Sequence, residues 1–400
     1  MYSGHPAQEN QHVIEESEKY PLKNFIVLVP EQFTMQTQKD LVSMHPRHGI
    51  MNIDVLSFAR LAYRVFEETG TKQMQVLDDE GKNLILRKIA GDYENKLTVL
   101  KGNIKKLGYI SEVKSVISEF TQYDIGEEEM DEMLDHLDED SRLYYKLKDI
   151  RLLYEGFQDY LRERYITKEE LLDVLNSQVK ESELLKNSVV VLDGFTGFTP
   201  VQNRLILELM RCCKEVWVTV TMDERENPYA YKHPYQLFGL SKQMVTTLVR
   251  MAGEDHIEVE EPVCLYGYPV KRFEKNQELA FLERNIFRYG SGRYDKAVEN
   301  LEIHAAGNPR QEADAVAEGI RRLVRKEQYR YRDIGVIVSD MNVYGDYLEQ
   351  AFENYGIPVF MDHKRSILLN SFVEYIRSLL NMAEKNFSYE SVFRFLRTNL

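Results

Sequence analysis

Residues 24–30 read NFIVLVP, a short run of apolar and β-branched side chains that ends at a proline. Such a run predicts a buried β-strand. Residues 33–43 have helical spacing, residues 50–56 (IMNIDVL) form a second apolar run, and residues 57–68 predict an amphipathic helix with Ser57 as its N-cap. Strands and helices that alternate through short connections are typical of a parallel α/β sheet.

The strand pattern returns much later in the chain. Residues 188–193 (SVVVLD) and 215–221 (EVWVTVT) are almost entirely apolar, as expected for strands inside a parallel sheet, and residues 200–212 between them predict a helix. Residues 78–186, in contrast, carry leucine, isoleucine and tyrosine at helical spacing and contain no proline. The simplest interpretation is one α/β domain that is interrupted by an all-helical insert and resumes after it.

A second α/β pattern occupies the end of the chain. Residues 301–307 (LEIHAAG), 334–338 and 358–361 predict strands, and residues 309–326 and 343–355 predict helices between them. The expected division of the chain is residues 1–77 for the first half of the α/β domain, 78–186 for the insert, 187–225 for the return to the first domain, 226–300 for a connecting helical region, and 301–400 for the second unit with its helical tail.

Composition excludes several classes of protein. The hydrophobic content of 43% and the charged content of 29% are those of a soluble globular protein, and no stretch approaches the roughly 20 apolar residues of a membrane span. The first residues hold no apolar signal segment. Cysteines without CxxC spacing and histidines without ligand spacing predict neither a disulfide framework nor a metal site. We therefore expect a cytoplasmic protein.

The net charge of −14 argues against nucleic-acid binding, because a phosphate backbone attracts a basic surface. The charge is uneven, however. Residues 124–140 contain ten carboxylates and no Lys or Arg, which leaves about −4 for the rest of the chain. Such a run is most often a solvated helical face or loop. It indicates where DNA does not lie and leaves DNA binding elsewhere open.

Four segments carry a resemblance to known proteins. They are VPEQ at residues 29–32, SFARLAYR at 57–64, DGFTGFTP at 193–200, and Gln-Glu-Ala at 311–313, in the first turn of a predicted helix. Their order resembles the motor-domain motifs of superfamily 1 helicases, and their combination resembles the AddB family over essentially the whole chain. The resemblance implies a RecA-like sheet domain of the P-loop NTPase type with a large helical insert, followed by the start of a second RecA-like domain.

The resemblance also implies a function. AddB proteins are subunits of the bacterial AddAB helicase and deoxyribonuclease, an ATP-dependent complex that acts in double-strand break repair by homologous recombination. The implied partners are an AddA-type helicase/nuclease subunit, in a heterodimer, and single-stranded and double-stranded DNA ends. The family's iron–sulfur cluster and Mg²⁺ belong to regions outside this sequence, so we expect no cofactor here. The last residues (FRFLRTNL) stop in mid-pattern, which predicts a fragment of a longer protein.

The departures from a working motor are as informative as the matches. An ATPase of this kind needs a phosphate loop, GxxxxGKS or GxxxxGKT, after its first strand. The residues before Phe25 hold one glycine and no such loop, so this amino terminus is either diverged or not the natural start. Asp193 is followed by Gly194 where a motor has Glu, and residues 221–223 (TMD) replace the glutamine that senses the γ-phosphate. We expect Asp193 to be a degenerate Walker B residue and ATP not to be hydrolysed by this chain alone.

Amide and aromatic side chains follow the first predicted strand. Gln32, Phe33, Gln36 and Gln38 would lie outside the carboxyl end of the sheet, where ligands of open α/β sheets bind. One interpretation is an ordinary solvated loop. The other is a DNA contact, because amides can bond base edges and an aromatic ring can stack on a base. Taken with the resemblance, these residues are expected to bind single-stranded DNA.

Two further segments offer candidates. Phe58, Arg60 and Tyr63 begin a helix, where periodicity alone allows Phe58 to be core and Arg60 to be solvated, whereas the resemblance places them beside DNA. Phe195 and Phe198 follow a strand and either pack under the sheet edge or stack on bases. The expected function is a non-hydrolysing subunit, without catalytic residues, that holds or scans single-stranded DNA. The alternative is a degenerate motor that serves only as a scaffold for the AddA subunit.

Overall fold

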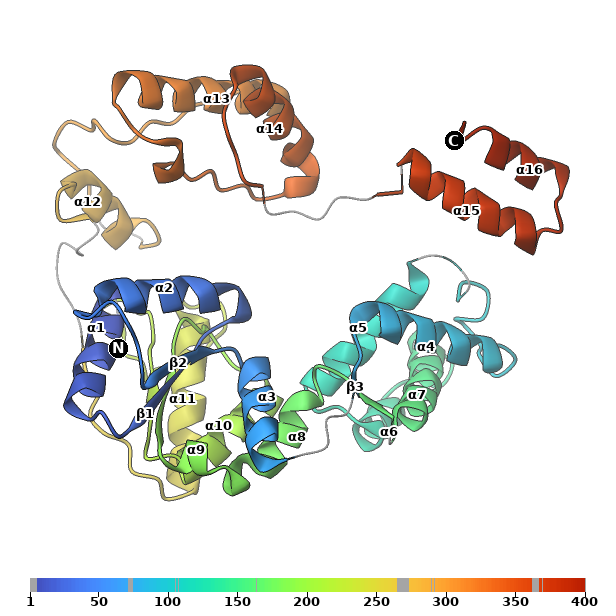
Figure 1. Cartoon of the computed structure of the whole chain (residues 1–400), viewed down its shortest axis with the longest axis horizontal. Helices are drawn as coiled ribbons and strands as arrows, with labels where there is room; N and C mark the ends of the chain where they lie inside the picture. The colour runs from blue at the N-terminus through green and yellow to red at the C-terminus, as the bar shows by residue number, and fades with distance from the viewer. Residues whose placement is uncertain are drawn as a thin grey trace. The chain divides into compact units, whose positions relative to one another are not determined.

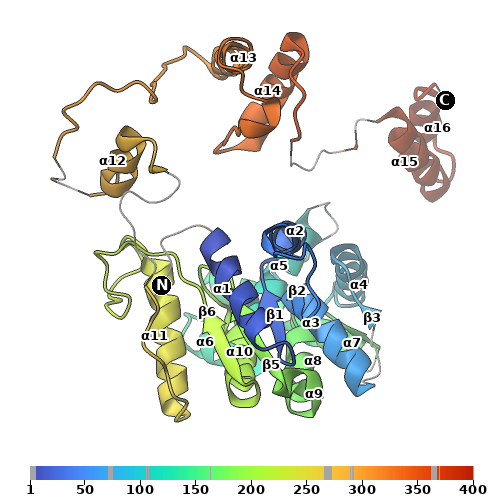
Figure 2. The ribbon, with the colours of Figure 1, turned by 60° about the vertical axis from the view of Figure 1, so that its left-hand side comes forward.

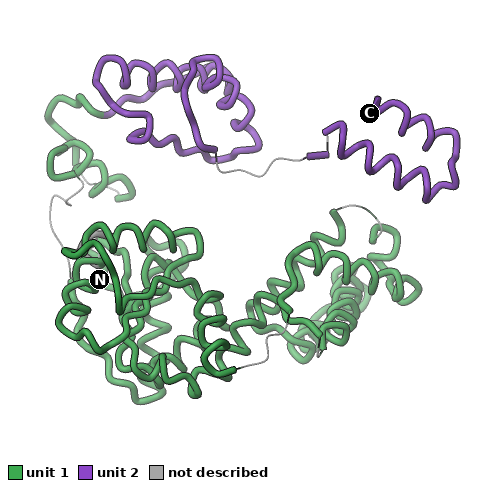
Figure 3. The backbone as a smooth tube through the Cα atoms, in the orientation of Figure 1, with its two compact units in different colours: residues 1–300 green, residues 301–400 purple. Residues whose placement is uncertain are grey.

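A computed structural model of the chain describes residues 6–70, 75–104, 106, 108–162, 164–264, 273–288, 290, 292–361, 367–368 and 370–399. The chain divides into two compact units, residues 1–300 and residues 301–400, which Figure 3 colours separately.

The first unit is organised around a parallel sheet of four strands. The central strands β1 (Asn24–Leu28) and β5 (Ser188–Leu192) pair with each other, β2 (Ile53–Leu56) lies beyond β1, and β6 (Glu215–Val218) lies beyond β5. The two central strands are almost wholly buried, which agrees with their apolar, β-branched sequences. The parallel α/β sheet is therefore as predicted.

Side chains of the central strand alternate between two apolar cores on opposite faces of the sheet. Phe25 and Val27 belong to one core, and Ile26 and Leu28 belong to the other. The first core is covered by α1 (Pro6–Lys19) and α2 (Thr34–Met44), and the second by α3 (Phe58–Thr69), α8 (Leu171–Gln178), α10 (Pro200–Cys212) and α11 (Gly239–Glu254), as the views in Figure 1 and Figure 2 show.

Local capping explains why several helices begin where the sequence predicts. The Ser57 hydroxyl accepts a hydrogen bond from the Arg60 amide and starts α3. Thr199 and Gln202 form a reciprocal capping box at the start of α10, with the Thr199 amide donating to Gln202 Oε1 at 2.9 Å. These bonds satisfy amides that the helix itself leaves without acceptors.

The insert is a helical subdomain with a core of its own. Its helices are α4 (Asp79–Asp92), α5 (Tyr109–Gln122), α6 (Glu127–Asp135) and α7 (Arg142–Leu161), and a short parallel ladder joins β3 (Gln75–Val76) to β4 (Tyr165–Ile166). The buried residues of this core run from Leu77 to Leu161. Leu171 and Leu175 of α8 are buried in the sheet domain's core instead. The helical core therefore ends earlier in the sequence than the expected insert boundary at residue 186.

The remaining described elements of the first unit are short turns and helices. Two 3₁₀ turns, η1 (Glu31–Phe33) and η2 (Val179–Glu181), follow β1 and α8, and α9 (Glu183–Lys186) precedes β5. The connecting region contains α12 (Gln277–Asn285).

In the second unit the predicted helices form but the predicted strands do not. Helices α13 (Pro309–Lys326) and α14 (Met341–Tyr355) pack on each other around Ala317 and Leu348. A 3₁₀ turn, η4 (Tyr331–Asp333), lies between them, and α15 (Ser371–Glu384) and α16 (Tyr389–Leu396) complete the unit.

The prediction of strands at residues 301–307, 334–338 and 358–361 is wrong, because the described residues 301–361 contain no strand. A strand exists only where a neighbouring strand accepts and donates its backbone hydrogen bonds. Among the described residues, these three segments have no ladder partner, and side chains such as Ile303 and Ile337 are fully or almost fully exposed. An apolar, β-branched run is therefore not sufficient to make a strand here.

No helix within the described part of the chain is long and apolar enough to cross a membrane.

Candidate nucleic-acid interface

The four parallel strands end at one edge of the sheet, and the loops that follow them begin side by side. The Val29 amide donates to the Leu56 carbonyl at 3.0 Å, which joins the first residue after β1 to the last residue of β2. The Asp193 amide donates to the Leu28 carbonyl at 2.9 Å and joins the end of β5 to that of β1. This carboxyl edge therefore gathers the candidate residues of three separate sequence motifs.

The first loop presents amide side chains. Gln32 lies in η1, immediately after β1, and is exposed; Gln36 and Gln38 lie on α2. The Gln36 amide donates to Asp40 Oδ1 at 2.7 Å along the same helix. Gln38 lies one turn beyond Thr34, where α2 begins, which places it about 6 Å further along the helix axis at 1.5 Å per residue. Gln32 is thus the amide nearest the strand end.

Two apolar side chains are exposed beside these amides. Phe33 is 50% exposed and Met35 is 79% exposed, although both lie at the start of α2 and near a buried core. An exposed ring beside a strand end is suited to stacking on a base. The sequence pattern identifies Phe33, but not Met35, as a candidate. Met35 could have been identified from the sequence, because it is an apolar residue on the polar side of an amphipathic helix.

The helix after β2 separates its candidate residues into a buried and an exposed group. Phe58 is 7% exposed and belongs to the sheet domain's core, which agrees with the structural interpretation that periodicity allowed for it. Arg60 and Tyr63 are exposed, and Arg64 is exposed on the following position. Residues three and four apart on a helix are neighbours on its surface. A ring and two guanidinium groups therefore share one side of α3.

The three phenylalanines form one aromatic cluster. The ring of Phe58 lies 5.5 Å from that of Phe195 and 6.4 Å from that of Phe198, and the latter two rings are 5.1 Å apart, centroid to centroid. Such separations are those of favourable aromatic pairs. Phe195 and Phe198 are half-buried and pack against the sheet domain's core. The buried ring of Phe58 packs against both of them. The cluster ties the loop after β5 to the start of α3.

The segment after β5 holds the candidate Walker B residue. Asp193 Oδ1 accepts a hydrogen bond from the Thr219 hydroxyl at 2.6 Å, which links the ends of β5 and β6. Gly194 follows with a φ of +76°, in the left-handed region that side-chain-bearing residues rarely adopt. The residue after the candidate Walker B residue therefore lies in a turn that favours glycine.

The segment after β6 is anchored to the connecting region. Asp223 Oδ1 and Oδ2 accept hydrogen bonds from Arg225 at 2.8 and 2.6 Å, and Arg288 lies within 3.4 Å of the same carboxylate. The hydrogen bond from the Arg225 side chain, together with the nearby positive charges, holds the pKa of Asp223 well below its ordinary value. Asp223 therefore stays ionised and serves as an anchor for both arginines.

Metal-ligating residues do not gather at this edge. In the parts of the chain that the structure describes, no group of three or more His, Cys, Asp or Glu could hold a metal ion. The three cysteines are free thiols, and burial raises the pKa of Cys213 to about 12. Cys213 is therefore a protonated, unreactive thiol at neutral pH.

Comparison with known proteins identifies relatives over the whole chain. A family described as "ADDB, N-terminal" matches residues 2–283. The B subunit of the ATP-dependent helicase/deoxyribonuclease of Lachnoclostridium phytofermentans is 44% identical over 405 residues, which cover 100% of this chain and 35% of that protein. Proteins of the same name from Caldanaerobacter subterraneus subsp. tengcongensis and Clostridium kluyveri are both 36% identical, over 98% and 94% of this chain and 33% of each relative. The chain spans about a third of the length of these relatives.

Proposed function

The chain belongs to the AddB family, and we propose that it forms the amino-terminal, DNA-holding part of the AddB subunit in an ATP-dependent helicase/deoxyribonuclease of the AddAB type. The relatives that support this proposal are subunits by name, so the proposal includes an AddA-type partner subunit. The proposed process is the repair of double-strand breaks by homologous recombination, with DNA ends as the substrate.

The observation that carries the proposal is the set of side chains exposed at the carboxyl edge of the sheet. Phe33 and Tyr63 offer exposed rings, Arg60 offers a guanidinium group, and Gln32 offers an amide, all on loops or helix starts that follow neighbouring strands. A single-stranded nucleic acid is bound by rings that stack on bases and by cations that contact phosphates. Phe195 and Phe198 are further candidates for stacking, and Phe58 is proposed to position them.

We propose further that this chain does not hydrolyse ATP by itself. The carboxyl edge offers Asp193, which is already hydrogen-bonded to Thr219, and a left-handed glycine where the second acid would stand. The described residues before β1 form helix α1 and a turn rather than a glycine-rich loop. These features of the described residues support this part of the proposal, because magnesium and nucleotide phosphates are held by paired acids and a glycine-rich loop.

The DNA-binding proposal is tested by fluorescence anisotropy with a fluorescein-labelled oligo(dT) at low salt. Replacing Phe33 or Tyr63 by alanine is expected to weaken binding about fivefold or more, because stacking contributes roughly 1–3 kcal/mol per base. Phe287→Ala, which removes another exposed ring of the same unit, is the matched control and should leave binding unchanged. Unchanged binding in both test variants, or no binding at all, would refute the site.

The salt dependence of binding tests the phosphate contact. Arg60→Ala should lower the slope of log affinity against log salt by about 0.7, the value for one phosphate contact on a single strand. Arg60→Lys should restore most of that slope because it keeps the charge. Arg87→Ala removes an exposed arginine of α4 and serves as the control.

A scaffold for the AddA subunit is the second candidate function. The observation that favours it is the acidic surface of the helical insert, where ten carboxylates lie between residues 124 and 140 and would repel DNA. A chain with this function alone would co-purify with the AddA subunit and show no affinity for the oligonucleotide. The anisotropy experiment therefore separates the two functions.

A further inference from the structure

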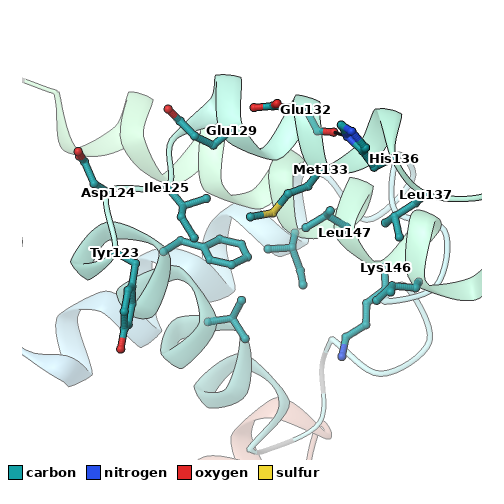
Figure 4. Close-up of a pocket in the computed structure, with 14 residues that line it drawn as sticks. Tyr123, Asp124, Ile125, Glu129, Glu132, Met133, His136, Leu137, Lys146 and Leu147 are labelled. Carbon is teal, nitrogen blue, oxygen red and sulfur yellow. Dashed lines mark hydrogen bonds between the residues drawn. The ribbon is translucent and has the colours of Figure 1, made fainter. Parts of the chain in front are cut away.

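A groove of about 740 Å³ lies on the helical insert, between the end of α5, α6 and α7. Figure 4 shows Met133 of α6 and Leu147 of α7 pointing into it, with Tyr123 and Asp124 at one end and Lys146 at the other. Its apolar floor is formed by half-buried or buried side chains, namely Val116, Phe120, Ile125, Leu137, Leu147 and Ile150.

The groove exists because the apolar side of α6 is only partly covered. Met130 is completely buried in the insert's core, whereas Met133, almost one turn further on, is 40% exposed and lines the groove. Ion pairs hold the outer side of the helix to α7. Arg151 donates to both carboxylate oxygens of Asp131, with the Nη2 to Oδ2 distance at 2.8 Å, and also pairs with Glu127 at 3.6 Å. The apolar side that faces the groove is left uncovered by the described elements of the insert.

The edges of the groove are strongly acidic. Figure 4 shows Glu129 and Glu132 along the α6 edge, pointing away from the floor. Arg151 and Arg204 pair with some carboxylates of this segment, including Asp124. Among the ion pairs of the described residues, however, none involves Glu129 or Glu132, the two carboxylates of α6 that line the groove. Lys146 is the one lysine or arginine among the described residues that line the groove.

We propose that this groove is a docking site for a basic amphipathic segment of a partner protein, which places apolar side chains on the floor and Lys or Arg against the carboxylates. An amphipathic helix laid into an apolar groove is a common mode of peptide recognition. Nucleic acid does not match this surface, because its phosphates would meet an excess of negative charge. The inference rests on the proposed function only in taking the chain to be one subunit of an assembly.

The test uses the whole chain and a fluorescein-labelled peptide with leucines on one helical face and lysines elsewhere. A second peptide carries serine in place of each leucine and keeps the same charge. The leucine peptide is expected to bind about tenfold more tightly or better, because each leucine that becomes buried favours binding. Equal binding of both peptides would overturn the proposal, since it would show attraction by charge alone.

Variants locate the binding site. Met133→Ser, a change at a half-exposed position that leaves the core intact, should weaken the leucine peptide about fivefold. Glu132→Gln should weaken it about twofold and reduce its salt dependence. Leu84→Ser, at an exposed leucine of α4 in the same subdomain, is the matched control. If Leu84→Ser weakens binding as much as Met133→Ser does, the groove is not the site.

Binding of labelled oligo(dT) to the Met133→Ser variant separates this inference from the DNA proposal. The variant should bind the oligonucleotide as tightly as the unaltered chain does, because Met133 lies in the insert and not at the sheet edge. Weaker oligonucleotide binding by Met133→Ser would mean that the groove takes nucleic acid, and the inference would fail. Peptide binding in a chain without DNA affinity would instead contradict only the DNA-holding role.

Discussion

Gly194, the residue after the candidate Walker B residue Asp193, is restricted by its own backbone conformation. Its φ of +76° lies in the left-handed region, and an added Cβ would meet Pro30 Cδ at 3.7 Å, an ordinary contact. The backbone conformation, and not the available space, therefore restricts this position. A glutamate here would need either a strained backbone or a different turn after β5.

We expect Gly194→Ala to lower the free energy of unfolding by about 1–2 kcal/mol, the usual cost of a left-handed conformation for a residue with a Cβ. Gly197→Ala is the control, because Gly197 has no positive φ and an added Cβ there meets no atom within 4 Å. Urea unfolding followed by circular dichroism measures both. Equal stabilities of the two variants would show that the turn after β5 adapts to the side chain.

At the scale of single residues, the sequence identifies candidate side chains but not the residues that surround them. Phe58 and Arg60 are two positions apart in one motif, and the motif assigned both to a DNA contact. The structure buries Phe58 in the aromatic cluster and leaves Arg60 exposed, because helix geometry turns them to different sides of α3. Periodicity alone allowed this difference but could not decide it before the neighbouring β5 loop was known.

At the scale of elements, a buried ion pair joins the insert to the segment before α8. Lys82 Nζ of α4 lies 2.7 Å from Glu169 Oε2, and both side chains are largely buried. Burial raises the pKa of Glu169, but the hydrogen bond and the charge of Lys82 outweigh burial and hold that pKa below its ordinary value of 4.5. The carboxylate therefore stays charged and paired down to acid pH.

Lys82→Met is expected to lower the free energy of unfolding at neutral pH by about 3–5 kcal/mol, because it leaves a buried carboxylate without its partner. A carboxyl group with a lowered pKa stabilises the fold fully above its unfolded-state pKa, and that stability is lost as pH falls through the folded-state pKa. The difference between the two proteins should therefore narrow as pH falls below 4.5. Denaturant unfolding at several pH values measures it.

Lys114→Met is the control for this pair. Lys114 Nζ lies 3.4 Å from Asp79 Oδ1, whose side chain is mostly exposed, so this ion pair should contribute at most about 1 kcal/mol. Similar losses of stability in the Lys82 and Lys114 variants would contradict the special role of the buried pair.

Element prediction succeeded where local chemistry sets the boundaries. Helix α10 begins at Pro200 and ends at Cys212, as predicted, because the Thr199 cap and the proline fix its start. The prediction of a strand at residues 334–338 is wrong for the opposite reason. Their apolar pattern is that of a strand, but a strand depends on a partner that is distant in sequence, and the described residues of this unit supply none.

At the scale of the whole molecule, each apolar core of the described residues draws its members from a single unit. Three such cores lie within residues 1–300, and the core of α13 and α14 lies within residues 301–400. A unit that contains its own core can fold by itself. The two units are therefore expected to unfold in separate transitions.

A chain truncated to residues 1–300 should keep the main thermal transition of the longer chain to within about 4 °C, the shift that 1 kcal/mol causes in a domain of similar size. Differential scanning calorimetry of both proteins measures it. A larger fall in the transition temperature would mean that residues 301–400 stabilise the first unit.

The sequence by itself determined the parallel sheet, the order of its strands and helices along the chain, and the family, because each depends on local periodicity, capping residues and short motifs. Only the tertiary structure decided which candidate side chains are exposed, how three phenylalanines from two motifs meet, and where α6 leaves an apolar groove. Those features depend on contacts between residues far apart in the chain, and a linear pattern does not record such contacts.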